Sequence, residues 1–433
     1  MDAVFAWIDG IPAVARIALI FVLILLFIKR NWSLGNAFVA GSLGLGIVFG
    51  MDPLAIARST GLALVHPKTL SLAAVVSLIL VLSHCLENSG QMSRLLDRFK
   101  GLIRNPKVNL VTFPALIGLL PMPGGAIFSA PMVKNLGHEH RLSSAHLSYI
   151  NYWFRHIWEY WWPLYPGILL TTALAGVDLW HLVAFTGPLT IVALAAGYWP
   201  LRGLIAIPAA PGPRKAVLPF FKELAPIVFV IVFGLLLGLF FSSVFVPPLL
   251  SVAKETGLIL ALLIALFWVW RANRMDWKTR WAIIKNPALV KMVYMVAAIL
   301  IFKGILEDSH AVAQVSREML RWDMPLLPIS MLLPFIVGGV AGITIAFVGT
   351  TFPILISLID TTGNNALLLP YLMLALASGF TGVLVSPLHL CFLLSNQYFR
   401  TPLVPVYKIM LVPLLSLLIG AVAYFELLCY WKG

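Results

Sequence analysis

Pro114-Ala-Leu-Ile-Gly118 returns 220 residues later as Pro334-Phe-Ile-Val-Gly338 in this chain of 433 residues. The same spacing pairs Glu87 with Glu307. Apolar segments that repeat with polar residues in register are typical of secondary transporters built from two structural repeats. Chance similarity is the alternative, but matched Glu, Ser, Pro and Gly residues argue against it. The sequence therefore predicts an internal duplication.

The composition places the chain in a membrane. It is 61% hydrophobic and 11% charged, with a mean hydropathy of +0.96. A water-soluble protein of this size has too little polar surface at such a composition. The apolar runs are long and continuous, which favours helices over a β-barrel. We expect an all-α polytopic membrane protein with about ten transmembrane helices at roughly 20 residues per span.

The net charge of +13 reflects membrane topology and does not indicate a nucleic-acid partner. Of the 30 Lys and Arg residues, 21 lie in six loops that our threading places on one side. These loops are 29–32, 91–108, 134–141, 202–223, 271–291 and 400–408. Because positive loops stay in the cytoplasm, we expect these loops inside and the N-terminus outside.

The threading predicts two halves with the same order of elements. The first repeat covers 1–203, a cytoplasmic Pro-rich linker covers 204–224, and the second repeat covers 225–433. Continuous spans are expected near 12–28, 33–50, 70–88, 180–199, 225–246, 256–270, 290–306 and 404–428. Re-entrant hairpins are expected at 109–133 and 327–358, and broken helices at 143–173 and 367–397, because Pro and Gly interrupt these segments.

The two repeats are predicted to have opposite orientations in the membrane. Each half has five spans, and an odd number inverts the second half relative to the first. The loop 91–108 has five basic residues and one acidic residue, whereas the matching loop 311–325 has equal numbers of both. The two hairpins are therefore expected to enter from opposite faces.

Irregular backbone at membrane depth is tolerated where it is buried in protein or lines a cavity, so the four breaks are candidate binding sites. The candidate substrate-binding residues are Pro123, Gly124, Gly125, Ser129, Asn151, Arg155, Gly342, Thr344, Thr350, Ser378, Thr381 and Ser386. Free amides at such breaks attract anions, and hydroxyl groups can coordinate a cation. The alternative is that the small residues only let helices pack closely.

Arg155 is the charged residue that most directly suggests a substrate. Asn151, Arg155 and Glu159 are spaced by four, so they share one helix face. A guanidinium group suits a carboxylate or phosphate, and His156, Glu159 or His389 can carry a coupling proton. Alternatively, Arg155 and Glu159 form an internal ion pair, the nearby tryptophans form an interfacial belt, and His389 is a packed core residue.

The three cysteines, Cys85, Cys391 and Cys429, lie far apart in apolar surroundings. They indicate neither a disulfide framework nor a thiolate metal site. We therefore interpret them as packing residues and expect no metal and no cofactor.

The segments 114–126 and 151–167 resemble the uncharacterised prokaryotic integral-membrane family called domain of unknown function 401, which is grouped with the ion-transporter superfamily. The resemblance implies opposed hairpins, a homodimer, and an elevator-like moving domain against a scaffold that includes spans 12–28 and 225–246. It also implies location in the cytoplasmic membrane of a prokaryote. The breaks lack the Ser-Asn-Thr triplet of sodium–dicarboxylate carriers, which favours proton coupling over sodium coupling.

These observations predict a secondary transporter that moves a small organic anion, coupled to protons and surrounded by membrane lipid. One alternative is a cation–proton exchanger in which Arg155 is structural and Glu159 is the exchanged carboxylate. Another is a translocase for a phosphate-bearing lipid carrier. The chain has no His-Glu-x-x-His, Gly-x-Gly-Asp or Gly-x-Ser-x-Gly motif, so we do not expect an enzyme.

Overall fold

The computed structural model confirms the all-α prediction. It describes residues 10–30, 32–99, 102, 105–121, 125–139, 142–202, 217–247, 249–322 and 325–432. Every regular element in these ranges is a helix.

The helices of the first half begin with α2 (Ala13–Lys29). They continue with α3 (Leu34–Val48), α4 (Pro53–Val65), α5 (Pro67–Asn88), α6 (Gln91–Phe99), α7 (Pro106–Gly118), α8 (Ala126–Glu139), α9 (Ser144–Trp153), η1 (Phe154–His156), α10 (Pro166–Ala175), α11 (Leu179–Thr186), α12 (Leu189–Tyr198) and η2 (Trp199–Leu201).

The helices of the second half begin with α13 (Val217–Val244). They continue with η3 (Leu249–Val252), α14 (Ala253–Ala272), α15 (Trp277–Ile284), α16 (Pro287–Asp308), α17 (Ala311–Arg321), α18 (Leu326–Ala341), α19 (Thr344–Thr361), η4 (Asn365–Leu367), α20 (Leu368–Val385), α21 (Leu390–Tyr398) and α22 (Leu403–Lys432).

Long apolar helices make this a multi-pass membrane protein. Within the described ranges, eight helical stretches are long and apolar enough to cross a bilayer. The outer helices α13 and α22 bury only 28% of their most apolar window and leave large apolar side chains exposed, as lipid-facing helices do. The predicted spans 12–28 and 33–50 correspond to α2 and α3, which have 17 and 15 residues. Both are shorter than the roughly 20 residues expected for a span, so the total of ten spans stays a prediction.

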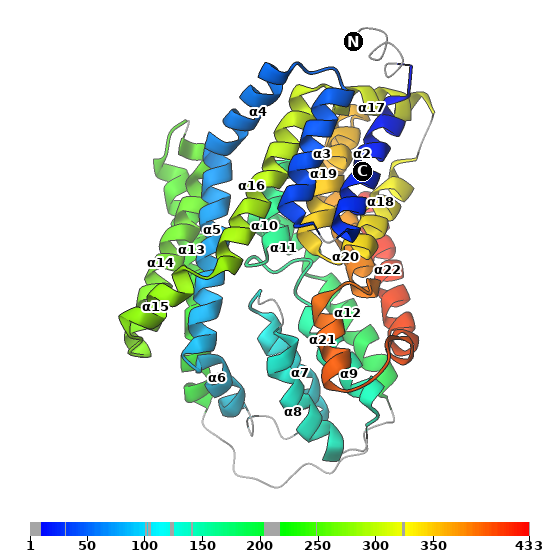
Figure 1. Cartoon of the computed structure of the whole chain (residues 1–433). Helices are drawn as coiled ribbons and strands as arrows, with labels where there is room; N and C mark the ends of the chain where they lie inside the picture. The colour runs from blue at the N-terminus through cyan, green and yellow to red at the C-terminus, as the bar shows by residue number, and fades with distance from the viewer. Residues whose placement is uncertain are drawn as a thin grey trace.

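Helix boundaries follow the 220-residue spacing of the sequence. The helices α5 and α16 each have 22 residues and begin at Pro67 and Pro287. Each is followed by a serine and then by a residue with positive φ, Gly90 at 69° and His310 at 55°. Figure 1 places α6 and α17, which follow these turns, at opposite ends of the molecule.

Each predicted hairpin consists of two helices joined by a short break. The first is α7 and α8, and the second is α18 and α19, which meet at Gly342 with φ 67°. Figure 1 shows α7 and α8 in the lower part of the molecule and α18 in the upper part. The entry of the hairpins from opposite membrane faces stays a prediction.

Both predicted broken helices are interrupted near prolines. The first consists of α9, η1 and α10, and the second of α20 and α21. Tyr165 and Ser386 each precede a proline and are extended, with ψ of 129° and 125°. A residue before proline is pushed out of the helical region, which explains why the chain breaks there.

Close backbone contact joins the second hairpin to the second broken helix. A Cβ on Gly338 would strike the carbonyl oxygen of Gly379, and a Cβ on Gly382 would strike that of Phe335. Glycine therefore lets α18 and α20 approach backbone to backbone.

Several helices lie outside the predicted spans, among them α4, α6, α15 and α17. Residues 53–65, which lie between the predicted spans 33–50 and 70–88, form α4 with Asp52 as its N-cap. The predicted linker 204–224 runs into α13, which begins at Val217, and the residues from 203 to 216 lie outside the described residues.

Candidate functional site

All four chain breaks meet at one cavity of about 260 Å³. Its lining includes Pro121 of the first hairpin, residues of the first broken helix, the tip of the second hairpin and the start of α21. The lining residues are Leu80, Pro121, Arg155, Glu159, Tyr165, Pro166, Gly167, Met292, Met295, Gly342, Ile343, Thr344, Ile345, His389, Leu390 and Cys391. Residues that are up to 311 positions apart thus line one cavity.

The first residues of three helices line this cavity. They are Pro166 and Gly167 of α10, Thr344 and Ile345 of α19, and Leu390 and Cys391 of α21. No side chain caps the start of any of these three described helices. Because backbone N–H groups and the positive end of the dipole lie at a helix N-terminus, the cavity has three elements suited to an anion.

Arg155 adds a permanent positive charge to the same cavity. It lies in η1 and is 3% exposed. A Cβ on Gly125 would overlap the guanidinium group, and a Cβ on Gly118 would overlap the backbone carbonyl of Arg155. These two glycines of the first hairpin therefore let it close around Arg155.

Hydrogen bonds at Glu159 and Tyr165 join the first broken helix to the two hairpins. The Thr344 hydroxyl donates to the Glu159 carboxylate at 3.3 Å, and the Tyr165 hydroxyl donates to the Gly118 carbonyl at 2.6 Å. Glu159 lines the cavity and is partly exposed. Its contact with Thr344 links a carboxylate of the first half to the second hairpin.

The predicted proton carriers His156 and His389 face each other. Their Nε2 atoms lie 3.2 Å apart, although the residues are 233 positions apart in sequence. The Nδ1 atom of His156 lies 2.6 Å from the Tyr152 carbonyl oxygen. The thiol of Cys391 completes a buried group in which the three ligand atoms lie within 4.8 Å of one another. The interpretation of all three cysteines as packing residues does not account for this position of Cys391.

Asn151 and Ser129, both predicted binding residues, bond to each other instead of lining the cavity. The Ser129 hydroxyl donates to Asn151 Oδ1 at 2.6 Å. The Asn151 amide donates to the Ala126 carbonyl at 2.9 Å and to the Ser395 hydroxyl at 2.6 Å. Asn151 therefore ties α8, α9 and α21 together beside the site.

The remaining predicted residues divide into three groups. Gly342 and Thr344 line the cavity, and Gly125 lies against Arg155. Thr350, Ser378, Thr381 and Ser386 do not line it; the first three donate to backbone carbonyls, and the Ser386 hydroxyl accepts from the Leu388 amide. Pro123 and Gly124 lie outside the described residues.

The sequence analysis missed several lining residues. Tyr165 and Cys391 belong to the predicted breaks, and the available signal was that Tyr165 precedes Pro166 and Cys391 lies two residues after His389. Leu80, Met292 and Met295 come from the continuous helices α5 and α16, which have no local signal for a site.

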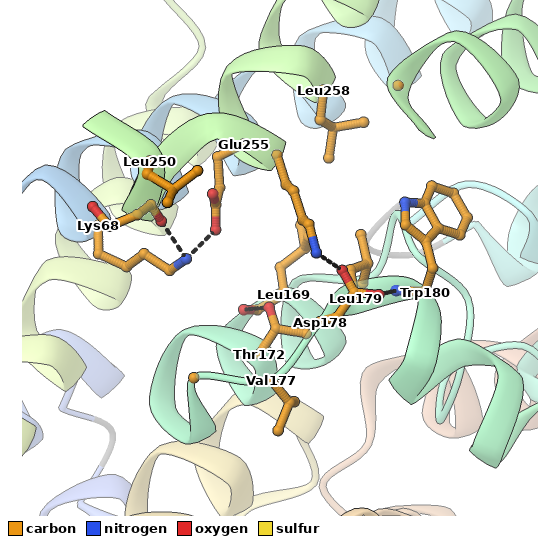
Figure 2. A pocket seen from close by; sticks show the side chains of 14 residues that line it. Lys68, Leu169, Thr172, Val177, Asp178, Leu179, Trp180, Leu250, Glu255 and Leu258 are labelled. Carbon is orange, nitrogen blue, oxygen red and sulfur yellow. Dashed lines mark hydrogen bonds and ion pairs between the residues drawn. The ribbon is translucent and has the colours of Figure 1, made fainter. Parts of the chain in front are cut away.

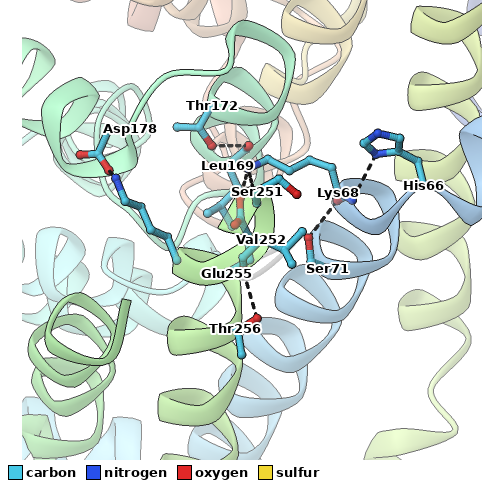
Figure 3. Close-up of polar contacts among 11 residues, drawn as sticks. His66, Lys68, Ser71, Leu169, Thr172, Asp178, Ser251, Val252, Glu255 and Thr256 are labelled. Atoms are coloured by element: carbon cyan, nitrogen blue, oxygen red, sulfur yellow. Dashed lines mark hydrogen bonds and ion pairs between the residues drawn. The ribbon is translucent and has the colours of Figure 1, made fainter. Parts of the chain in front are cut away.

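A second cavity, of about 190 Å³, lies where α5, α14 and the α10–α11 connection meet (Figure 2). Lys68 pairs with Glu255 at 2.6 Å, and Lys254 pairs with Asp178. Figure 3 shows Lys68 also reaching Ser251, whose carbonyl accepts from Nζ at 3.0 Å. These two ammonium groups are balanced by two carboxylates, so the second cavity suits an anion less well than the first.

The family model described as "Protein of unknown function (DUF401)" matches residues 13–427. The chain belongs to this family. The match confirms the family resemblance carried by the segments 114–126 and 151–167. No curated protein matches the chain. Membership of the ion-transporter superfamily stays a prediction.

Proposed function

We propose that this protein is a secondary transporter for a small organic anion. The observation that carries the proposal is the convergence of Arg155 and three uncapped helix N-termini on one cavity. Half-helix N-termini that point at an anionic group are a recurrent feature of transporter binding sites. A volume of about 260 Å³ accommodates a small carboxylate.

In this proposal the two halves of the chain contact different parts of the substrate. Arg155 and the start of α10 supply charge recognition from the first half. Thr344, with the first residues of α19 and α21, supplies backbone and hydroxyl contacts from the second half. Because the guanidinium group is planar and has several donors, it favours a carboxylate or phosphate group.

Glu159 is the proposed carrier of the coupling proton. It lines the substrate cavity, and its carboxylate accepts a hydrogen bond from Thr344 at the tip of the second hairpin. Protonation would remove the negative charge from the cavity and weaken this contact. Proton binding would thereby affect both the anion and the hairpin that covers it.

The movement that we propose is elevator-like, with the hairpins and broken helices moving against a scaffold that includes the predicted α2 and α13 together with α5, α14 and α16. The cavity supports this division, because Leu80, Met292 and Met295 contribute an apolar wall from α5 and α16. An apolar wall makes no directional bonds to the substrate, so it can act as the surface past which the site moves. Homodimer formation and the inverted orientation of the repeats are part of the same proposal.

Counterflow in proteoliposomes tests the substrate class. Vesicles loaded with unlabelled gluconate, succinate or citrate should take up the same labelled solute for at least one member of the panel. Arg155→Gln should reduce the affinity, whereas Arg155→Lys should retain part of it, because the charge stays and the bidentate geometry is lost. Unchanged affinity in Arg155→Gln would contradict the role of Arg155.

Glu159→Gln separates coupling from binding. We expect this variant to keep counterflow, which needs no net proton movement, and to lose accumulation driven by a pH gradient. If accumulation persists in Glu159→Gln, His156 and His389 remain as the candidate carriers of the coupling proton.

Two further assays address the alternatives. Sodium-dependent proton flux without organic solute would favour a cation–proton exchanger. Binding of a lipid phosphate without binding of free carboxylates would favour a lipid-carrier translocase.

A further inference from the structure

We propose that His156, His389 and Cys391 form a binding site for a soft or borderline transition-metal ion, with Zn²⁺ and Cu(I) as the biological candidates. The proposal goes beyond anion transport and does not rest on it. It starts from the proximity of two imidazoles and one thiol, all buried, with ligand atoms within 4.8 Å of one another. Two nitrogens and one thiolate sulfur are a donor set that these ions favour.

The orientation of His156 supports metal binding. Its Nδ1 lies 2.6 Å from the Tyr152 carbonyl oxygen, which only accepts hydrogen bonds, so the ring proton is on Nδ1. With the proton on Nδ1, the Nε2 atom of a neutral His156 ring carries the lone pair and faces His389. Metal-binding histidines commonly donate their second ring N–H to a backbone carbonyl in this way.

The distance between the histidines also fits a shared ion. Two zinc–nitrogen bonds of about 2.0–2.1 Å at a tetrahedral angle place the two nitrogens about 3.3–3.4 Å apart. The observed separation of the Nε2 atoms is 3.2 Å. The two imidazole nitrogens therefore need to move apart by only a few tenths of an ångström to bind one ion.

The site would connect the two halves and open onto the cavity. His156 belongs to η1 of the first broken helix, whereas His389 and Cys391 lie at the start of α21 in the second. His389 and Cys391 line the cavity, so a fourth coordination position would face it. Three protein ligands with one open position are the arrangement of zinc sites that also bind a small ligand.

Cobalt titration of the purified full-length protein tests the proposal, with any affinity tag removed. Co²⁺ replaces Zn²⁺ and gives a thiolate-to-metal absorption in the near ultraviolet. We expect one Co²⁺ per chain with this absorption, displaced by Zn²⁺. Cys391→Ser should lose the absorption, whereas Cys85→Ser and Cys429→Ser, at cysteines elsewhere in the chain, should keep it.

The histidines provide a second set of variants. His156→Gln and His389→Gln should each weaken Co²⁺ binding by more than the roughly 10–100-fold that loss of an outer partner costs. An anaerobic competition between the protein and a Cu(I) chelator distinguishes the two biological ions. The variant that replaces Cys85, which is also buried, serves as the folding reference for Cys391→Ser in gel filtration and thermal unfolding.

X-ray absorption spectroscopy of the zinc-loaded wild-type protein gives a result that does not depend on any variant. We expect one sulfur and two imidazole nitrogens around the ion. A sulfur-free coordination shell, no thiolate absorption at stoichiometric Co²⁺, or retention of this absorption in Cys391→Ser would overturn the proposal. None of these results affects the proposed transport of an organic anion.

Discussion

At the scale of single residues, glycines position the charge that the proposed function needs. Gly118 lies against the backbone of Arg155, and Gly125 lies against its guanidinium group. The two contacts differ physically, because a backbone carbonyl cannot move easily and the end of a long side chain can. Alanine at these two positions should therefore have different consequences.

Gly125→Ala should weaken ligand binding while leaving the fold intact. The added methyl group would displace the guanidinium group from its place beside the first hairpin. We expect at least about a tenfold loss of affinity, which corresponds to about 1.4 kcal/mol, for the solute found by counterflow. Gly339→Ala is the control, because its nearest contact is an ordinary 3.7 Å. Equal affinity in the two variants would contradict the placement of Arg155.

Gly118→Ala should destabilise the protein instead. Its Cβ would overlap the backbone carbonyl oxygen of Arg155, and overpacking of this kind costs typically about 1–3 kcal/mol. Thermal unfolding in detergent, compared with Gly339→Ala, measures the difference. A midpoint equal to that of the control would show that α7 does not pack on η1 as described.

At the scale of secondary structure elements, an ion pair joins α14 to the connection between α10 and α11. Lys254 of α14 pairs with Asp178, which is also the N-cap of α11 and is labelled in Figures 2 and 3. Burial raises the pKa of Asp178, but the hydrogen bond from Lys254 and that from the His181 amide together bring the pKa below its ordinary value.

This pKa shift predicts a stability that depends on pH. The pKa of Asp178 is lower in the folded protein than in the unfolded chain, where it is about 4. The ionised carboxylate therefore stabilises the fold fully above the unfolded-state pKa, and this stabilisation is lost as pH falls through the folded-state pKa. Asp178→Asn should therefore lower the melting midpoint at pH 7 and reduce its further fall toward pH 3. A double-mutant cycle with Lys254→Gln should give a coupling energy of about 0–1 kcal/mol. If the melting midpoint of Asp178→Asn depended on pH as the wild-type midpoint does, this result would contradict the ion pair.

At the scale of the whole molecule, much of the architecture followed from the sequence, but the composition of the site did not. Prolines mark the breaks in the first and second broken helices, because proline acts locally on the residue before it. The helix α4 was missed, since its apolar stretch is short. The proximity of Cys391 to His156 was not predicted, because the two residues are 235 positions apart and no local pattern reports such a contact.

The proposed inversion of the second repeat implies different accessibility at matched positions. Ser93 of α6 and Ala313 of α17 are 220 positions apart and both exposed. In a variant without native cysteines, a membrane-impermeant maleimide added to intact cells should label Ala313→Cys and not Ser93→Cys. In inside-out vesicles the pattern should reverse. Labelling of both from the same side would contradict the inverted topology.

Uptake into proteoliposomes under an imposed pH gradient tests the central claim most directly. With the wild-type protein, an acidic exterior should drive accumulation of a labelled carboxylate above equilibrium, and a protonophore should abolish the accumulation. Arg155→Gln, in vesicles with equal amounts of folded protein, should not accumulate it. The account would be contradicted if no carboxylate accumulates while sodium alone drives proton movement in the same vesicles.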